Sequence, residues 1–336
     1  MNTMEESDEH SHFPKYLQED DITLECKELI QTLPMEKGWV STHLHQYQGF
    51  WQTKKHLQGV LSFQKHFQAH DTDIILATSP KAGTTWLKAL IFALLNRKRY
   101  PNIHDNNHPL LTTNPHVLVP FLELSLYIEK DILPDINSFS APRLFSTHVP
   151  YKSLPKSIKD STCKVVYLCR DPKDTFASMW HFTNKIRPQN RETLQLEESF
   201  EKFSRGVSLF GPFWEHLLGY WKESLERQEK VMFLRYEEMK MKPCFYLKEV
   251  AEFLGCPFSK EEESKGVVDD ILNLCSFEKL SNLEVNKFGK LPSGEENKAF
   301  FRSGKVGDWK TLLSIEMIER LNTVIEQNLG KHGMSF

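Results

Sequence analysis

The sequence predicts a single α/β domain built around a doubly wound parallel sheet. Three short apolar runs have the composition of buried strands, and each is followed by a loop and a helical pattern. Strands that alternate with helices favour a parallel sheet with helices on both faces. Because no internal repeat and no Gly/Ser-rich linker divides the chain, residues 21–336 are expected to form one domain.

The first two strands are expected at residues 73–78 and 164–168. After the first, leucine and isoleucine recur at three- and four-residue spacing over residues 85–97, which is the pattern of an amphipathic helix. After the second, a helical stretch runs through Trp180. Both units therefore have the strand–loop–helix form of a doubly wound sheet.

The third strand, residues 231–234, precedes the clearest helix signals in the chain. Pro243 suits the first turn of a helix and Gly255 its end. The side chains predicted to be buried by this helix are Phe245, Leu247, Val250 and Leu254. Ser259 and Glu262 have the spacing of a capping box for the next helix, and a last helix is expected at about residues 315–329.

Charge and composition argue against several classes of function. A net charge of −3 and a pI near 6.5 argue against broad binding to nucleic acid or to a membrane surface. No apolar run reaches the roughly 18–20 residues that cross a bilayer. Residues 1–20 form a polar, acidic tail that we expect to be disordered, and they have neither the pattern of a secretory signal nor that of a transit peptide.

The six cysteines contain no CxxC pair, so the sequence predicts neither a disulfide framework nor a zinc site. We therefore expect mostly buried free thiols in a cytoplasmic protein. His66 and His70 have a spacing that could hold zinc on one face of a helix. A solvated helix face is the favoured interpretation of this pair, and no metal is predicted.

Residues 78–86 follow the first strand, at the edge where open α/β sheets bind ligands. Gly83 permits a tight turn, and the first amides of the next helix point at one spot, which together with the helix dipole makes an anion site. Lys81 adds a positive charge. The pattern predicts a phosphate-binding strand–loop–helix, although taken alone a plain turn with a surface lysine is about as frequent.

Two further basic elements strengthen this interpretation. Arg170 lies just beyond the second strand and Ser178 about two helical turns later, so that both could bind one phosphate. The alternative is a structural ion pair between Arg170 and Asp171. Residues 301–309 place Arg302 among glycines, with a solvated loop as the alternative. Three such elements in an acidic chain favour an anion site with several contacts.

Three segments resemble the cytosolic sulfotransferase family closely. They are TSPKAGTTWLKAL (78–90), YLCRDPKDTFASMWHF (167–182) and FFRSGKVGDWK (300–310). Flanking stretches are similar to the plant branch: KGW (37–39), NPHVLVPFLE (114–123), GPFWEHLLGYW (211–221) and LCSFEKLSNLEVNK (274–287). The resemblance implies a cytoplasmic enzyme that moves a sulfuryl group from 3′-phosphoadenosine 5′-phosphosulfate (PAPS) to a hydroxyl of a small organic acceptor.

The resemblance also implies a role for each matching position. The 5′ side of the donor would be held by Lys81, Ala82, Gly83, Thr84, Thr85 and Trp86, with Lys81 near the bridging oxygen and Trp86 against adenine. The 3′-phosphate would be held by Arg170, Ser178, Arg302, Ser303 and Gly304, and the adenosine by Tyr236, Ser276 and Phe277. His148 takes the position of the catalytic base, which makes His148 and Lys81 the predicted catalytic residues.

Two positions depart from the family's pattern. Ser146 stands where many animal relatives carry a lysine, two residues before the histidine. Ser303 stands where the family has a lysine between Arg and Gly. Each change removes a cation, so weaker contacts to the transition state and to the donor are expected.

The acceptor is expected in an apolar pocket. Its predicted walls are Tyr47, Trp51, Tyr151 and Trp180, although each of these residue types more often belongs to a core. Plant members of the family act on flavonols, brassinosteroids, hydroxyjasmonate and desulfoglucosinolates, and the sequence does not select among these acceptors. The animal dimer motif is matched only in character, which predicts a monomer or a weak homodimer.

Two other functions stay open at this point. A nucleotide kinase or NTPase would use a similar loop, but that loop needs a lysine directly after its last glycine, where this chain has Thr84. A catalytically inactive nucleotide sensor is the second. The joint presence of Lys81, His148 and Arg170 argues against it.

Overall fold

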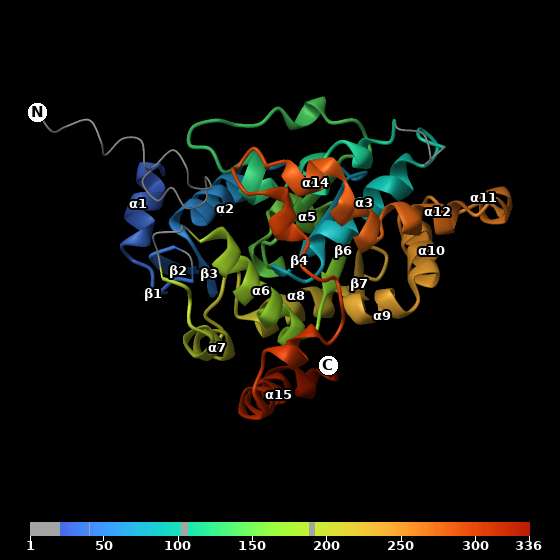
Figure 1. The fold of residues 1–336 in the computed structure, drawn as a ribbon. Coiled ribbons are helices and arrows are strands. Elements are labelled where there is room, and N and C mark those ends of the chain that lie inside the picture. Colours follow the sequence, from blue (N-terminus) through green and yellow to red (C-terminus); the bar gives the residue numbers. More distant parts are fainter. Residues whose placement is uncertain (1–20, 40, 102–106, 188–191) are drawn as a thin grey trace, which may run out of the picture.

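A four-stranded parallel sheet lies at the centre of the chain (Figure 1). The computed structural model describes residues 21–39, 41–101, 107–187 and 192–336, so the predicted tail, residues 1–20, lies outside the described residues. In spatial order the strands are β5 (Leu144–Thr147), β4 (Ile74–Thr78), β6 (Lys164–Cys169) and β7 (Val231–Arg235). The three predicted strands are therefore confirmed as β4, β6 and β7, and β5 is a strand that the sequence did not predict.

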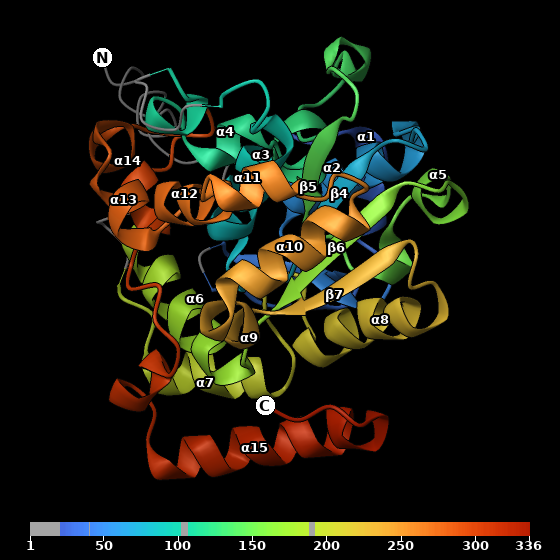
Figure 2. The same ribbon diagram turned by 90° about the vertical axis from the view of Figure 1, so that its right-hand side faces the viewer.

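Helices cover both faces of this sheet because successive residues of a strand point to opposite sides. One face, which includes Ile75 and Val165, packs against α2 (Lys54–His66), α6 (Pro172–Ile186) and α8 (Phe213–Glu226). The other face, which includes Leu76 and Val166, packs against α3 (Thr84–Asn96), α10 (Pro243–Phe253) and α12 (Val267–Leu274). Figure 2 shows α10 crossing in front of the strands. The predicted doubly wound α/β fold is confirmed.

A small antiparallel sheet precedes the parallel one. It consists of β1 (Met35–Lys37), β2 (His43–Tyr47) and β3 (Phe50–Gln52), and follows α1 (Leu24–Ile30). Trp51 joins this sheet to the body, since its amide donates to Gly211 and its carbonyl accepts from Phe210. Helix α2 ends at His66, so His66 and His70 do not share a helix face. The favoured interpretation as a solvated helix face is therefore wrong, as is the alternative of a zinc pair on such a face.

Shorter helices lie between and beyond the strands. They are α4 (Pro115–Leu118), α5 (Lys156–Asp160), α7 (Leu196–Ser204), α9 (Tyr236–Met241), α11 (Lys260–Ser264), α13 (Phe277–Asn282), α14 (Glu284–Phe288) and the longer α15 (Ile315–Leu329). The capping box of Ser259 and Glu262 is present at the start of α11, and α15 has the predicted bounds.

One predicted core residue of α10 is wrong. Leu247 and Val250 are buried, whereas Phe245 is 54% exposed. At 3.6 residues per turn, a position two residues before Leu247 lies about 200° around the helix from it. Phe245 therefore points away from the core. An apolar side chain alone was not enough to predict its burial.

Candidate active site

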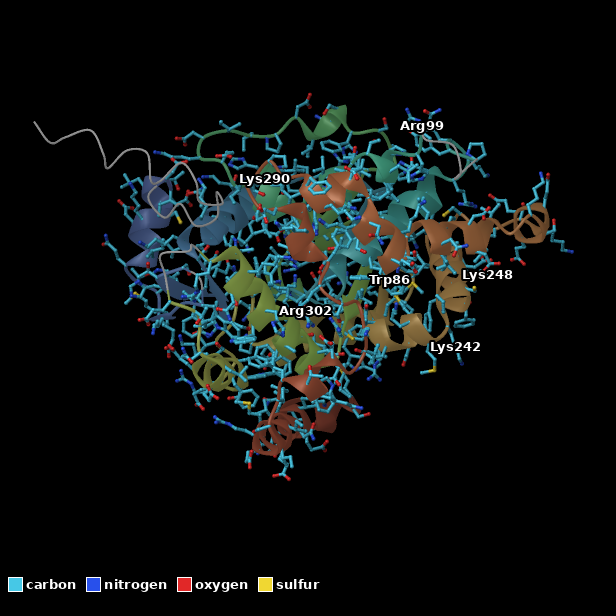
Figure 3. The ribbon with its side chains drawn as sticks, in the orientation of Figure 1. Trp86, Arg99, Lys242, Lys248, Lys290 and Arg302 are labelled. Atoms are coloured by element: carbon cyan, nitrogen blue, oxygen red, sulfur yellow. The ribbon has the colours of Figure 1, made fainter. Side chains whose placement is uncertain are left out.

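The carboxyl ends of the parallel strands open onto a cavity of about 720 Å³. Every residue predicted to bind the donor or to act in catalysis, except the fully buried Ala82, lines this cavity. The lining includes His148, Lys81, Gly83, Thr84, Thr85, Trp86, Arg170, Ser178, Tyr236, Ser276, Phe277, Arg302, Ser303 and Gly304. Figure 3 labels Trp86 and Arg302, which come from opposite ends of the sequence and both lie toward the middle of that view. Segments more than 200 residues apart in the sequence thus form one site.

The loop after β4 turns sharply into α3. Lys81 has a φ of 69° and Gly83 a φ of 110°, both in the left-handed region that ordinary side chains avoid. A Cβ on Gly83 would lie 2.7 Å from the ring of Tyr236, so only glycine fits this approach. Helix α3 begins at Thr84 without a side-chain cap. Since the first amides of a helix have no partner within it, these donors are available to an anion in the cavity.

Arg170 reaches the cavity from the end of β6. Its Nη2 donates to the carbonyl of Lys305 at 2.7 Å and lies 3.3 Å from the carboxylate of Asp174. The alternative pairing with Asp171 is wrong, because Asp171 caps the start of α6 and forms an ion pair with Lys173. Within the described parts of the chain, the buried Nε of Arg170 has no hydrogen-bond partner. The side chain of Arg170 borders the cavity, where its positive charge can attract an anion.

Tyr236 ties the C-terminal loop to the strand ends. Its hydroxyl donates to the carbonyl of Gly304 at 2.9 Å, and its ring meets that of Trp86 edge to face at 5.5 Å. The guanidinium of Arg170 lies 4.7 Å above the same ring. Three separate chain segments are thereby held around one end of the cavity.

The charges at this end of the cavity are predominantly positive. The ammonium of Lys81 lies 3.7 Å above the ring of Phe182. Burial, together with the nearby charges of Arg302, Arg170 and Lys185, lowers the pKa of Lys81 to about 7. Crowded cations of this kind favour a ligand with several negative charges. A bis-phosphorylated nucleotide fits this donor set.

His148 follows β5 and lies beside the end of β4, because the parallel register pairs Ala77 with Thr147. Its Nδ1 is 2.7 Å from the carbonyl oxygen of Thr78. A carbonyl oxygen only accepts, so Nδ1 carries the hydrogen and Nε2 is left with a lone pair. Burial holds the pKa of His148 well below its usual range, which keeps the ring neutral. This imidazole is therefore a hydrogen-bond acceptor at Nε2.

A buried carboxylate supports the backbone at His148. Glu123 accepts from the amide of His148 at 2.7 Å and from the hydroxyl of Thr147 at 2.8 Å. Burial raises the pKa of Glu123 to about 7 even though these hydrogen bonds lower it. The contacts anchor the turn that carries the imidazole.

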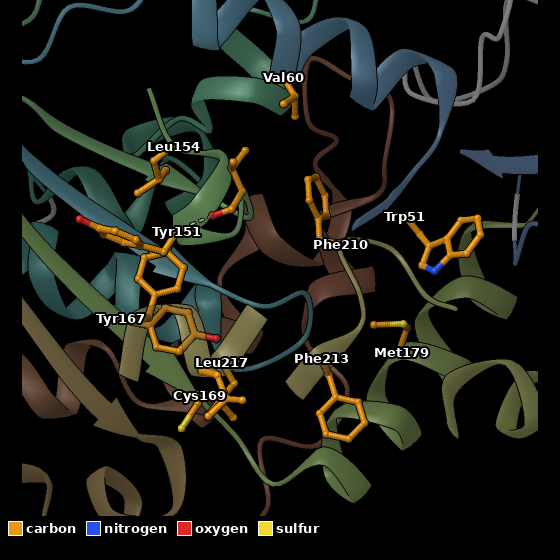
Figure 4. Close-up of a cluster of buried hydrophobic side chains, with 14 of the residues drawn as sticks. Trp51, Val60, Tyr151, Leu154, Tyr167, Cys169, Met179, Phe210, Phe213 and Leu217 are labelled. Atoms are coloured by element: carbon orange, nitrogen blue, oxygen red, sulfur yellow. Dashed lines mark hydrogen bonds between the residues drawn. The ribbon is translucent and has the colours of Figure 1, made fainter. Parts of the chain in front are cut away.

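The rest of the cavity is lined mainly by apolar side chains. They include Leu44, Leu124, Ile128, Met179, Leu209 and Phe210. None of the four side chains predicted to form its walls borders it. Trp51 and Tyr151 belong to the buried core (Figure 4). The Trp180 indole donates to the carbonyl of Leu194, and Tyr47 hydrogen-bonds Gln64.

Comparison with known proteins agrees with this geometry. The family model described as the sulfotransferase domain matches residues 71–333. The chain belongs to the sulfotransferase family. Cytosolic sulfotransferase 5 of Arabidopsis thaliana is 52% identical over 94% of this chain and 98% of its own length, and cytosolic sulfotransferase 12 is 50% identical over 97% and 98%. The predicted family and enzyme class are thus confirmed, and the relatives' names agree with the predicted cytoplasmic location.

Solved sulfotransferase structures share the fold. An A. thaliana protein proposed as a steroid sulphotransferase superposes with a TM-score of 0.75 at 44% identity, covering 96% of this chain and 99% of that one. Mouse sulfotransferase SULT7A1 was solved with 3′-phosphoadenosine 5′-phosphate (PAP). It superposes with a TM-score of 0.64 at 24% identity, covering 85% of this chain and 94% of that one. The second likeness, at this low identity, concerns the fold.

The two departures from the sulfotransferase pattern have different surroundings. Ser146 is fully buried, and its hydroxyl donates to the carbonyls of Val119 and Pro120. Ser303 lines the cavity, and its hydroxyl accepts weakly from the amide of Lys305 at 3.4 Å. The serine at 146 is therefore built into the backbone packing, whereas the serine at 303 faces the ligand space.

Three polar residues near the site were not singled out from the sequence. Lys88 is fully buried on α3, His116 lines the cavity from α4, and Glu123 is fully buried. The sequence did contain patterns that could have drawn attention to them. Lys88 and Glu123 are ionisable residues among leucines, and His116 follows Asn-Pro at the start of a short helix. These patterns mark burial of a polar group without showing its partner.

Four of the six cysteines are buried, as predicted. Among the residues that the structure describes, no group of three or more His, Cys, Asp or Glu side chains is placed to hold a metal ion. In the same ranges, no helix has the length and apolar character needed to cross a membrane.

Proposed function

We propose that this sulfotransferase transfers a sulfuryl group from PAPS to a hydroxyl of a small organic acceptor, a plant secondary metabolite or hormone, with His148 as general base. The observation that carries the proposal is the protonation pattern of His148. Its Nδ1 donates to the Thr78 carbonyl at 2.7 Å, which leaves Nε2 as a base in a cavity that Lys81 also lines. A neutral imidazole suits general-base catalysis near pH 7.

The donor fits the positive end of the cavity. The first amides of α3 and the ammonium of Lys81 would hold its 5′ side. Arg170 and Arg302 would hold the 3′-phosphate. Trp86 and Tyr236 offer aromatic surface to the adenine. When bound, PAPS supplies the sulfuryl group and a phosphate as leaving group.

The protein's contribution to the reaction is placement and charge stabilisation. His148 Nε2 takes the proton from the acceptor hydroxyl while the acceptor oxygen forms a bond to sulfur and the bond from sulfur to the phosphate oxygen breaks. Lys81 and the α3 amides stabilise the negative charge that stays on the phosphate. Holding both reactants in line in one cavity removes most of the entropic cost of their encounter.

A transfer assay with PAPS labelled in its sulfuryl group tests the proposal. The panel would hold flavonols, brassinosteroids, hydroxyjasmonate and desulfoglucosinolates, and transfer to at least one of them is expected. Transfer to none of these hydroxylated compounds, with PAP bound normally, would favour the inactive nucleotide sensor.

Calorimetric titration with PAP and with ATP separates the nucleotide kinase alternative. PAP is expected to bind far more tightly than ATP and without magnesium, because the proposed contacts of Arg170 and Arg302 are to a 3′-phosphate that ATP lacks. Magnesium-dependent binding of ATP in preference to PAP would overturn the donor assignment. The oligomeric state, a monomer or a weak homodimer, stays a prediction.

A further inference from the structure

Lys88, His116 and Thr85 form a chain of hydrogen bonds behind the donor end of the cavity. The Nζ of Lys88 lies 3.0 Å from Nδ1 of His116, and Nε2 of His116 lies 2.9 Å from the hydroxyl of Thr85. Lys88 is fully buried and does not line the cavity, whereas His116 and Thr85 do. The chain therefore leads from the protein interior to the predicted 5′-phosphate site.

The surroundings of Lys88 act on its charge in opposite directions. Its Nζ lies 3.4 Å above the centre of the Phe121 ring, a cation–π geometry. Burial lowers the pKa of Lys88 well below its usual range, while the nearby carboxylate of Glu123 raises it. An anionic donor bound beside His116 would favour the charged form further.

The direction of each hydrogen bond follows from these groups. When Lys88 is an ammonium, which only donates, Nδ1 of His116 accepts and its Nε2 carries the hydrogen. Nε2 then donates to the hydroxyl oxygen of Thr85. The hydrogen of that hydroxyl can then be donated to another group, and Thr85 lines the cavity.

His116 is held in place by aromatic contacts. Its ring stacks on Phe121, with centroids 5.6 Å apart, and lies 4.4 Å from the ring of Phe300. Burial, together with the charges of Lys88 and Lys81, holds the pKa of His116 well below its usual range. The ring is neutral and fixed in orientation, as a relay of hydrogen-bond direction requires.

We propose that Lys88 and His116 are positioning residues that set the Thr85 hydroxyl to donate to the 5′-phosphate of the donor. The inference rests on the proposed function, since it concerns the same donor site. Without Lys88, Nε2 of His116 could accept instead of donate. The Thr85 hydroxyl would then donate to His116 and would present only lone pairs to an anion. Lys88 thus acts on the donor from the interior, in a chain that has Ser146 where many animal relatives carry a lysine.

The experiment measures the affinity for two nucleotides, PAP and adenosine 3′-phosphate, by calorimetry. Lys88→Met and His116→Phe are each expected to weaken PAP binding about tenfold, as for the loss of one charge-assisted hydrogen bond. Neither change should affect adenosine 3′-phosphate, which has no 5′-phosphate. A general structural defect would weaken both ligands alike, so the pair of ligands separates the two explanations.

Two further variants test the direction of the bonds. His116→Gln has an oxygen that accepts from Lys88 and an amide that donates to Thr85, so it should recover most of the PAP affinity lost in His116→Phe. Thr85→Val should weaken PAP about tenfold, and adding Lys88→Met to it should cause no further loss because the target hydroxyl is gone. His108→Phe is the matched control, since His108 is equally buried but lies outside the cavity lining.

The possible outcomes are distinguishable. If the wild-type protein does not bind PAP, the proposed function fails. If it does, and Lys88→Met binds PAP as the wild type does, or loses both ligands equally, the inference alone is overturned. Additive losses in the Thr85 and Lys88 double variant would overturn it too. If Lys88→Met does not fold, as judged by its melting curve, the comparison of His116→Gln with His116→Phe decides the question.

Discussion

The two ends of the cavity differ in how they are built. The donor end is formed by short continuous segments, and the loop after β4 with the start of α3 supplies five of the lining residues, all within positions 81–86. The acceptor end is formed by side chains from separate places, such as Leu44, Leu124, Met179 and Leu209. Every predicted donor residue but Ala82 borders the cavity, whereas none of the four predicted acceptor residues does.

This difference has a physical cause. A phosphate site built from backbone amides needs glycine at a left-handed φ and a helix start in a set order, and such constraints leave a local pattern. An apolar pocket needs only side chains of suitable volume, which look the same in the sequence as core residues. Donor-binding residues can therefore be predicted from short sequence motifs, whereas acceptor-binding residues cannot.

The largest expected effect concerns the histidine between the two ends. His148→Ala should lower kcat by ~10²–10⁴-fold, because general-base help is removed. PAP affinity should be unchanged, since no donor contact is assigned to this ring. Steady-state kinetics and PAP titration check both parts, with His108→Ala as control. Ordinary turnover by the variant would remove His148 from the proposed role.

Donor affinity should also depend on pH through Lys81. Its pKa of about 7 in the ligand-free protein means that the ammonium loses its proton as the pH rises above 7. An anion binds the charged form, so PAP affinity is present below this pKa and should fall between pH 7 and 9, by at most about tenfold per unit. The dissociation constant of PAP across this range is the measurement. In Lys81→Met the slope should be lost, and an unchanged slope would assign it to another group.

A smaller effect is expected at the C-terminal loop. Arg302→Gln should raise the KM for PAPS about tenfold, since one charge-assisted contact is lost, and should leave the acceptor KM unchanged. Lys310→Gln is a matched control, because Lys310 is a basic residue of the same segment outside the cavity lining. A change confined to the acceptor KM would contradict the assignment of this loop to the donor end.

The smallest effects are expected at the acceptor end. Leu124→Ala should change the relative kcat/KM among acceptors by about tenfold or less and leave the KM for PAPS as it is. Trp180→Phe, at a position once expected to line the pocket, should leave the acceptor profile as in the wild type. If the acceptor profile changes in the Trp180 variant and not in the Leu124 variant, then Trp180 and not Leu124 contacts the acceptor.

The fold was predictable where composition, periodicity and the residues at helix ends all indicated the same element. β4, β6 and β7 are apolar runs, and Pro243 and Gly255 bracket a helix whose buried positions at Leu247 and Val250 follow its period. β5 was missed because Leu144–Thr147 is short and half polar, and its burial comes from distant partners such as the carbonyls of Val119 and Pro120. This missed strand carries His148 to its place, so His148 was proposed as the base from the resemblance alone.

By itself the sequence determined β4, β6 and β7 with the helices that follow them, the tight turn at Gly83 and the positive residues around it, because each depends on neighbours a few positions away. The tertiary structure decided what depends on distant partners. The Thr78 carbonyl accepts from Nδ1 of His148, which leaves a lone pair on Nε2, and Lys88 meets His116 from another helix. Which side chains face an acceptor rather than a core was likewise decided only when the segments packed together.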